Sequence, residues 1–170
     1  MKSHDLLIHL EWDGPYKYSE LHELMDDQND YGVYQIYGTH PIYGSGVLLY
    51  IGKSDRQTFG QRISQKGWDY NSDAENLKIY VGRLAGSFTP SNKQWGREID
   101  LVERLLIYSH KPAYNTQSLN SIPDKELQNV HVLNWKHYCD LLPEVSGARW
   151  TSKFDYMPEY EVYGNHEKEK

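Results

Sequence analysis

The chain has a single cysteine, Cys139, and no apolar run long enough to cross a membrane as a helix. One thiol cannot form an internal disulfide, which favours a reducing compartment. The N-terminus lacks the basic start and the apolar segment of a secretory signal. We therefore expect a cytoplasmic protein with no membrane partner and a half-buried, unreactive Cys139. Its 170 residues suit one domain with extensions.

A strong excess of positive charge is also absent, because the net charge is −6. This argues against a chain coated with basic residues for nucleic acid. The charge is uneven, however, with −6 on residues 1–31, +3 on residues 32–115 and −3 on residues 116–170. The central surplus permits phosphate binding, although a solvated surface of mixed charge has the same composition.

Tyrosine is abundant, with 15 residues, and the central segment opens with two short strands that each carry one. Residues 31–37 and 47–52 have the alternation of strands, and the Gly/Pro-rich gap 38–46 is too long for a two-residue turn. A hairpin would set Tyr34 and Tyr50 on neighbouring strands, able to point into one pocket. Tyrosine is also a favourable strand residue, so a purely structural role is the alternative.

Hydrophobic periodicity predicts the remaining elements. They are strands at residues 5–12, 77–84 and 130–133, a short helix capped by Ser19, and helices at 59–66, 94–110 and 135–142. In helix 94–110 the apolar stripe leaves Glu103 at its flank. A carboxylate there lies at the border between core and cleft, although a plain ion pair with a neighbouring arginine would also explain it.

Arg62 in helix 59–66 shares a face with Lys66, four residues later. A planar guanidinium donates two parallel hydrogen bonds to phosphate oxygens and stays charged, so Arg62 is a candidate phosphate ligand. The alternative is an ordinary solvated basic face.

These residues, in this order, resemble the GIY-YIG nuclease family. The first triplet of that family appears as Gly32-Val33-Tyr34 and the second as Tyr50-Ile51-Gly52. The family's helix arginine matches Arg62, and its helix glutamate matches Glu103. The asparagine of its Pro-x-x-Asn ending matches Asn115.

The resemblance covers roughly residues 31–116, which it implies are the nuclease core. It implies an α+β fold in which a small, mainly antiparallel three-stranded sheet is flanked by helices. Residues 1–30 would then be an N-terminal extension of one strand and one helix. Residues 117–170 would be a C-terminal extension that contacts DNA or a second subunit.

For the chemistry, the resemblance implies that Tyr34 is the general base and that Tyr50 positions the water or the phosphate. Lys53 would support Tyr34 or the attacking water. A tyrosine with a pKa near 10 is a poor base at neutral pH, so we expect nearby positive charge to favour the phenolate. Lys66 stands where some relatives carry histidine, which strengthens the case for a tyrosine base.

Arg62 would bind the scissile phosphate, and Asn115 would hold the active-site backbone by hydrogen bonds. Glu103 would hold one Mg²⁺ or Mn²⁺ ion, since a hard cation that keeps most of its waters needs a single carboxylate. The chain has no Asp/Glu-x-Lys triplet, which counts against the commonest restriction-enzyme core.

The expected function is a Mg²⁺-dependent, sequence-specific endonuclease that resembles the type II restriction enzymes of the family. Its partner would be double-stranded DNA, and a palindromic target favours a homodimer at least on DNA. Two alternatives stay open. One is a nicking or structure-specific nuclease of repair or phage type, and the other is a non-catalytic DNA- or protein-binding module.

Overall fold

The structure is a computed structural model that describes residues 5–68, 76–120 and 126–150. The strands are β1 (Leu6–Tyr16), β2 (Gly32–His40), β3 (Gly44–Ser54), β4 (Lys78–Ala85), β5 (Val130–Lys136) and β6 (Glu144–Ser146). The helices are α1 (Phe59–Gln65) and α2 (Asn92–His110), with 3-10 turns η1 (Tyr18–Glu23), η4 (Leu127–Asn129) and η5 (Gly147–Trp150). Residues 151–170 of the expected C-terminal extension lie outside the described residues.

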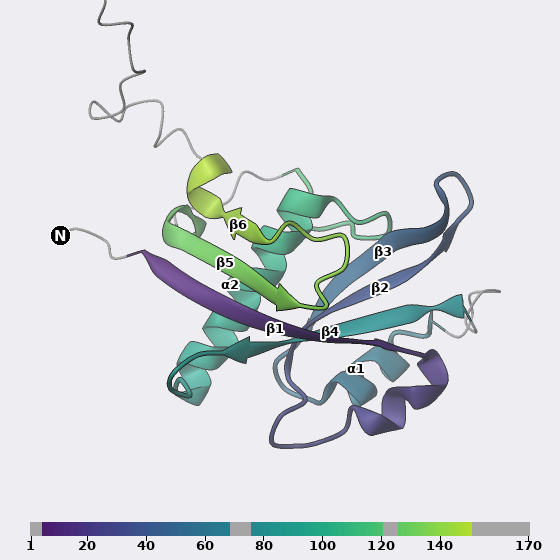
Figure 1. Cartoon of the computed structure of the whole chain (residues 1–170), viewed down its shortest axis with the longest axis horizontal. Helices are drawn as coiled ribbons and strands as arrows, with labels where there is room; N and C mark the ends of the chain where they lie inside the picture. Colours follow the sequence, from purple (N-terminus) through teal and green to yellow (C-terminus); the bar gives the residue numbers. More distant parts are fainter. Residues whose placement is uncertain (1–4, 69–75, 121–125, 151–170) are drawn as a thin grey trace, which may run out of the picture.

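The six strands form one sheet in the order β3-β2-β4-β1-β5-β6 (Figure 1). Every neighbouring pair is antiparallel except β1 and β5, which run parallel. This mixed sheet curls into half a barrel. The prediction of a small, mainly antiparallel three-stranded sheet flanked by helices is therefore wrong.

The difference comes from β1, which lies inside the sheet rather than beside it. Its alternation of apolar residues correctly predicts a strand, but alternation does not say which strands will pair with it. β1 pairs with β4 along one edge and with β5 along the other. Strands from before and after residues 31–116 thus extend the sheet formed by β2, β3 and β4. The division of the chain into an N-terminal extension, a core and a C-terminal extension stays a prediction.

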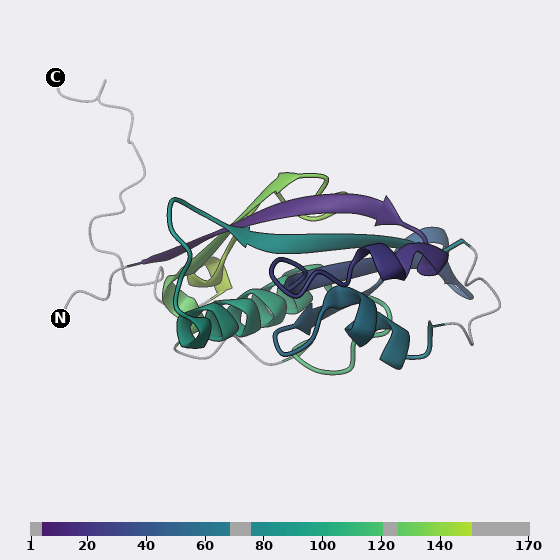
Figure 2. The same ribbon diagram turned by 90° about the horizontal axis from the view of Figure 1, so that it is seen from below.

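The two helices pack in different apolar clusters of the sheet. Val33 and Tyr34 are adjacent in β2 and point to opposite sides. Val33 packs in a core with Trp12, Ile51 and the apolar side of α2, whereas Tyr34 packs with Phe59 of α1 and with η1. Figure 2 shows α1 close to η1, with α2 running along the other half of the sheet. No helix among the described residues is long and apolar enough to cross a membrane.

Two local predictions for the segment that follows β5 are wrong. Residues 135–142 do not form a helix, because β5 continues through Lys136 and the chain then turns. The buried Asn134 holds this turn, accepting from the Trp12 indole and donating to the Leu142 carbonyl. Cys139 lies in the turn and is exposed rather than half-buried.

The short helix expected after Ser19 is the turn η1, which begins one residue earlier at Tyr18. Its N-cap position is Lys17 rather than Ser19. The Lys17 backbone N–H donates to the Glu20 carboxylate at 2.8 Å, which satisfies one end of the turn. The expected strand and turn of the N-terminal segment are thus present, with a different cap.

Candidate active site

Two neighbouring strands, β2 and β3, set Tyr34 and Tyr50 beside each other. Tyr34 pairs with Gly52 in the register and is fully buried, whereas Tyr50 is half-buried. Their ring centroids are 6.1 Å apart. A Cβ on Gly52 would lie 2.6 Å from the Tyr34 hydroxyl and 2.6 Å from Tyr50 Cε1. The glycine of the second triplet therefore makes room for the tyrosine pair.

Helix α1 carries Arg62 to the same place. The Phe59 N–H donates to the Asp30 carbonyl at 2.9 Å, which ties the start of the helix to the loop before β2. Phe59 and Ile63 are buried, and the Phe59 ring meets Tyr34 edge-on at 6.5 Å. Arg62 lies on a different side of the helix, close enough to Tyr34 for its positive charge to favour the phenolate.

Helix α2 brings Glu103 and Asp100 to Lys53 of β3. Lys53 Nζ forms a hydrogen-bonded ion pair with Asp100 and lies 3.7 Å from Glu103 Oε2. The Glu103 side chain is 17% exposed, so it lies at the border of the core as the helix pattern predicts. Asp100 was not among the expected site residues. The signal that could have found it is its spacing of three residues from Glu103, which places both on one helix face.

The charges around Glu103 are not balanced. The pKa of Glu103 is raised to about 7, mainly by burial and to a smaller extent by the carboxylates of Asp100 and Asp55. The positive charges of Lys53 and Arg62 act the other way without compensating. Burial also disfavours the charged form of Lys53, but its hydrogen bond to Asp100 and the charge of Glu103 outweigh burial and raise the pKa of Lys53.

The Tyr34 hydroxyl is buried and has no hydrogen-bond partner in the part of the chain that the structure describes. Burial raises the pKa of Tyr34 well above its usual range, and Tyr50 and Glu103 raise it further, while Arg62 lowers it. The positive charge of Arg62 thus favours the phenolate as expected, but desolvation is the larger effect and the pKa is raised overall. An unpartnered buried hydroxyl is costly, so this one suits a group that binds there.

A pocket of about 450 Å³ opens beside these residues. It is lined by Lys53, Ser54, Asp55, Arg56, Gln57 and Arg62. Its floor is thus the end of β3 and the loop before α1, and two of the expected site residues face it. Tyr34 and Glu103 lie next to this lining rather than in it, within electrostatic reach of Arg62, and Glu103 also of Lys53. Tyr50 packs beside Tyr34.

Asn115 lies behind β3 rather than on the pocket. It is buried, and its side chain accepts from Ile51 N–H at 3.0 Å and donates to the Ile51 carbonyl at 2.9 Å. The preceding residue, Tyr114, donates its backbone N–H to the Leu49 carbonyl at 2.8 Å. The segment after α2 therefore braces the edge of β3 on either side of Tyr50.

The donor set suits a hard divalent cation better than a transition metal. The described residues contain no group of three or more His, Cys, Asp or Glu side chains placed to share an ion. Glu103 instead offers one carboxylate whose ionised form is disfavoured by burial, and the nearby positive charges do not compensate for this. A Mg²⁺ ion that keeps most of its waters fits such a site, since it needs one carboxylate and substrate oxygens.

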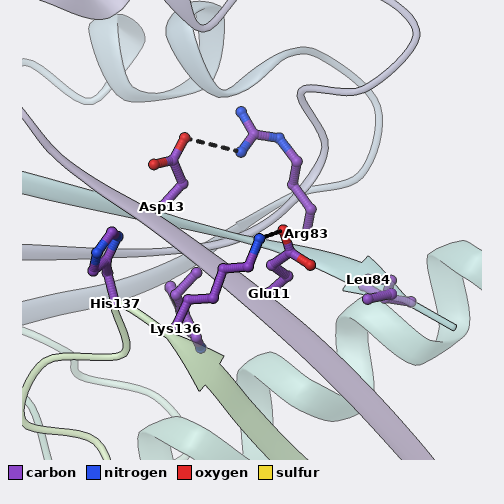
Figure 3. Close-up of a pocket in the computed structure, with 8 residues that line it drawn as sticks. Glu11, Asp13, Arg83, Leu84, Lys136 and His137 are labelled. Carbon is purple, nitrogen blue, oxygen red and sulfur yellow. Dashed lines mark hydrogen bonds and ion pairs between the residues drawn. The ribbon is translucent and has the colours of Figure 1, made fainter.

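A second pocket, of about 490 Å³, opens on the sheet over β1, β4 and β5 (Figure 3). Its charged side chains face one another: Lys136 pairs with Glu11, and Arg83 Nη1 lies 3.7 Å from Asp13 Oδ2. Arg83 also binds the buried Asp30 at 2.6 Å. Because these charges are matched within the protein, we assign no site there.

No known family model, no curated protein and no solved structure matches the chain.

Proposed function

We propose that the chain is a divalent-metal-dependent DNA endonuclease of the GIY-YIG type. The observation that carries this proposal is the convergence of Tyr34, Arg62, Lys53 and Glu103 from four separate elements at the end of β3. Hydrolysis of a phosphodiester needs a proton acceptor for the attacking water and positive charge at the phosphate. This cluster offers both.

Arg62 would bind two oxygens of the scissile phosphate, which neutralises the charge that develops as water attacks phosphorus. The buried Tyr34 hydroxyl, which has no hydrogen-bond partner among the residues that the structure describes, would orient that water and accept its proton in the phenolate form. Because burial raises the pKa of Tyr34, the phenolate is scarce near neutral pH. Arg62 partly offsets this cost, and we expect the cleavage rate to rise with pH.

Glu103 would hold a Mg²⁺ or Mn²⁺ ion, with Asp100 keeping Lys53 beside it. A bound ion of this kind stabilises the charge on the leaving oxygen. Tyr50 would bind the phosphate or the water through its hydroxyl, which Lys66 Nζ approaches to 3.3 Å. Asn115 would act on the backbone of Ile51 rather than on the substrate.

The substrate we propose is double-stranded DNA cut at a defined sequence, with a homodimer forming at least on a palindromic target. The test incubates the protein with supercoiled plasmid and Mg²⁺, beside the Glu103→Gln and Arg62→Ala variants. Discrete fragments support a restriction enzyme, and nicking or smearing supports a structure-specific nuclease. Absence of cutting by the wild type with Mg²⁺ or Mn²⁺ would contradict the proposal.

Two variants act as matched controls. Glu98→Gln changes another carboxylate of α2, which hydrogen-bonds Gln94 at 2.8 Å on the exposed side. Arg97→Ala removes a 66% exposed arginine of the same helix. Both should cut as the wild type does, so a loss confined to Glu103→Gln and Arg62→Ala would separate chemistry from general damage to the fold.

A further inference from the structure

Aromatic rings form a continuous row from the candidate active site to the tip of the β2–β3 hairpin. The members of this aromatic row are Tyr50, Trp68, Tyr114, His40 and Tyr43. From Tyr50 outward, successive ring centroids are 5.5, 6.3, 5.2 and 4.5 Å apart. The inner member, Tyr50, is the residue 6.1 Å from Tyr34. The row therefore links three separate parts of the chain to the site.

The outer members of the aromatic row are open to solvent. Tyr43 is 67% exposed and Tyr114 is 38% exposed, and Ile42 beside Tyr43 is 82% exposed. Figure 1 shows the β2–β3 hairpin projecting away from the helices. Rings placed only to fill a core would be buried, and these are not.

The tip is also held in one conformation. His40 Nδ1 accepts hydrogen bonds from the backbone N–H groups of Ile42 and Tyr43 at 3.1 and 3.2 Å. The His40 and Tyr43 rings then stack with an interplanar angle of 21°. A rigid ring pair at an exposed turn loses little conformational entropy when a ligand stacks on it.

The inner end of the row carries positive charge. Lys66 Nζ lies 5.4 Å from the centre of the Tyr50 ring and 3.3 Å from its hydroxyl. Lys66 is exposed, so its ammonium group can reach a phosphate while remaining beside the ring. Flat rings along a path, with a cation at one end, are the chemistry that binds single-stranded nucleic acid.

We propose that the aromatic row is a stacking platform for unpaired bases of the DNA strand next to the cleavage position. The inference takes DNA as the ligand from the proposed function, where it favours the structure-specific nuclease over a restriction enzyme that cuts intact duplex, and it does not require cleavage. Bases would stack on the exposed faces of Tyr43 and Tyr114, and Lys66 would contact the backbone between them and the site. A substrate with a single-stranded segment beside a duplex would therefore bind more tightly than a blunt duplex.

The test measures binding in EDTA, so that cleavage does not enter. Fluorescence anisotropy compares a 12-nucleotide single strand, a blunt duplex and a duplex with a single-stranded tail. The proteins are the wild type, Tyr43→Ala, Tyr43→Phe and Tyr114→Ala. The control is Phe88→Ala, which removes a 75% exposed ring in the loop before α2, outside the aromatic row.

We expect Tyr43→Ala and Tyr114→Ala each to weaken binding of the tailed duplex about tenfold, which is within the range for loss of one base-stacking ring. Tyr43→Phe keeps the ring and should bind as the wild type does, and so should Phe88→Ala. A 2-aminopurine base in the tail should be quenched on binding to the wild type and less so by Tyr43→Ala.

Equal affinity of wild type and ring variants for the tailed duplex would overturn the proposal. So would a wild type that binds no nucleic acid but dimerises through the hairpin, with Ile42→Asp restoring a monomer. The two proposals can fail separately. If the rings bind DNA but no Mg²⁺-dependent cleavage occurs, the stacking proposal holds and the nuclease proposal fails. If the protein cleaves DNA but the ring variants bind as the wild type does, the nuclease proposal holds and the stacking proposal fails.

Discussion

The two described pockets differ in how their charges are matched. Over β1, β4 and β5, Arg83 faces Asp13 and Asp30, and Lys136 faces Glu11. Beside the pocket at the end of β3, Glu103 has a pKa raised to about 7, and the neighbouring Tyr34 hydroxyl has no partner among the described residues. The two pockets thus have similar volumes, but the charged groups of the first are paired with one another, whereas polar groups beside the second are not. A pocket whose groups are satisfied contributes to stability, whereas unsatisfied groups are the ones available to a ligand.

The largest expected contrast between the two pockets is in activity. Glu103→Gln should lower the Mg²⁺-dependent cleavage rate about 1000-fold, because it removes the carboxylate that would hold the ion. Glu11→Gln, which breaks the ion pair with Lys136 in the other pocket, should change the rate less than about twofold. Initial rates on one plasmid measure both. Equal losses of cleavage rate in the two variants would contradict the proposed difference between the two pockets.

The next contrast concerns stability and pH. Glu103 binds its proton more tightly in the folded protein, with a pKa of about 7, than in the unfolded chain, where it is near 4.5. Folding therefore keeps a proton that the unfolded chain releases, and stability falls as pH rises from about 4.5 to about 7. The full effect is on the order of 3 kcal/mol.

Urea unfolding at pH 5 and pH 8 measures this dependence. Glu103→Gln cannot ionise, so it should lose less stability than the wild type across that interval. Glu98→Gln is the control on the same helix and should keep the wild-type dependence. If Glu103→Gln and the wild type show the same change between the two pH values, burial does not raise the pKa of Glu103 as we infer.

Asn115→Ala should destabilise the fold by about 2 kcal/mol, because it leaves the buried N–H and carbonyl of Ile51 without partners. Cleavage should fall as well, since the backbone beside Tyr50 loses its brace. Asn29→Ala removes an exposed asparagine that bonds Asp26, and it should cost less than about 1 kcal/mol. Chemical unfolding at pH 7 compares them, and a cost for Asn115→Ala no larger than that of the control would contradict the bracing role.

The smallest effect belongs to the matched pocket. The hydrogen bond from Tyr16, at 2.5 Å, lowers the pKa of Asp13, and the charge of Arg83 also contributes. The ionised form is therefore stabilised on folding, and this contribution is lost as pH falls through the lowered pKa. Because Asp13 is 53% exposed, Asp13→Asn should cost less than about 1 kcal/mol at pH 7. The cost should shrink as pH falls below 3.8 and the carboxyl group becomes protonated, and a cost that does not change with pH would not be electrostatic.

The elements of the fold could be predicted more fully than their arrangement. The sequence pattern places β2, β3, β4 and α2 close to their observed bounds. The partners of β1 could not be read in this way, since pairing with β5 joins residues more than a hundred positions apart. The helix expected at 135–142 failed because the long-range bonds of Asn134 stabilise a turn instead.

Within the candidate site, the order of the motifs along the sequence predicted which residues lie close together, but it did not predict their pKa values or ion pairs. The spacing of the triplets placed Tyr34 and Tyr50 on adjacent strands, and the apolar stripe of α2 placed Glu103 at a border. The direction of the Tyr34 pKa depends on how completely the ring is buried, which no local pattern reports. The ion pair of Asp100 with Lys53 likewise depends on how α2 packs on β3.

The most direct test of the unmatched site is a ¹³C NMR titration of the glutamate carboxyl groups, with Glu103→Gln used for assignment. In EDTA the account predicts that Glu103 titrates near pH 7. With Mg²⁺ present its pKa should fall, while the resonance of Glu11 in the matched pocket stays unchanged. A Glu103 pKa that is ordinary in EDTA, or that is the same with and without Mg²⁺, would contradict the account.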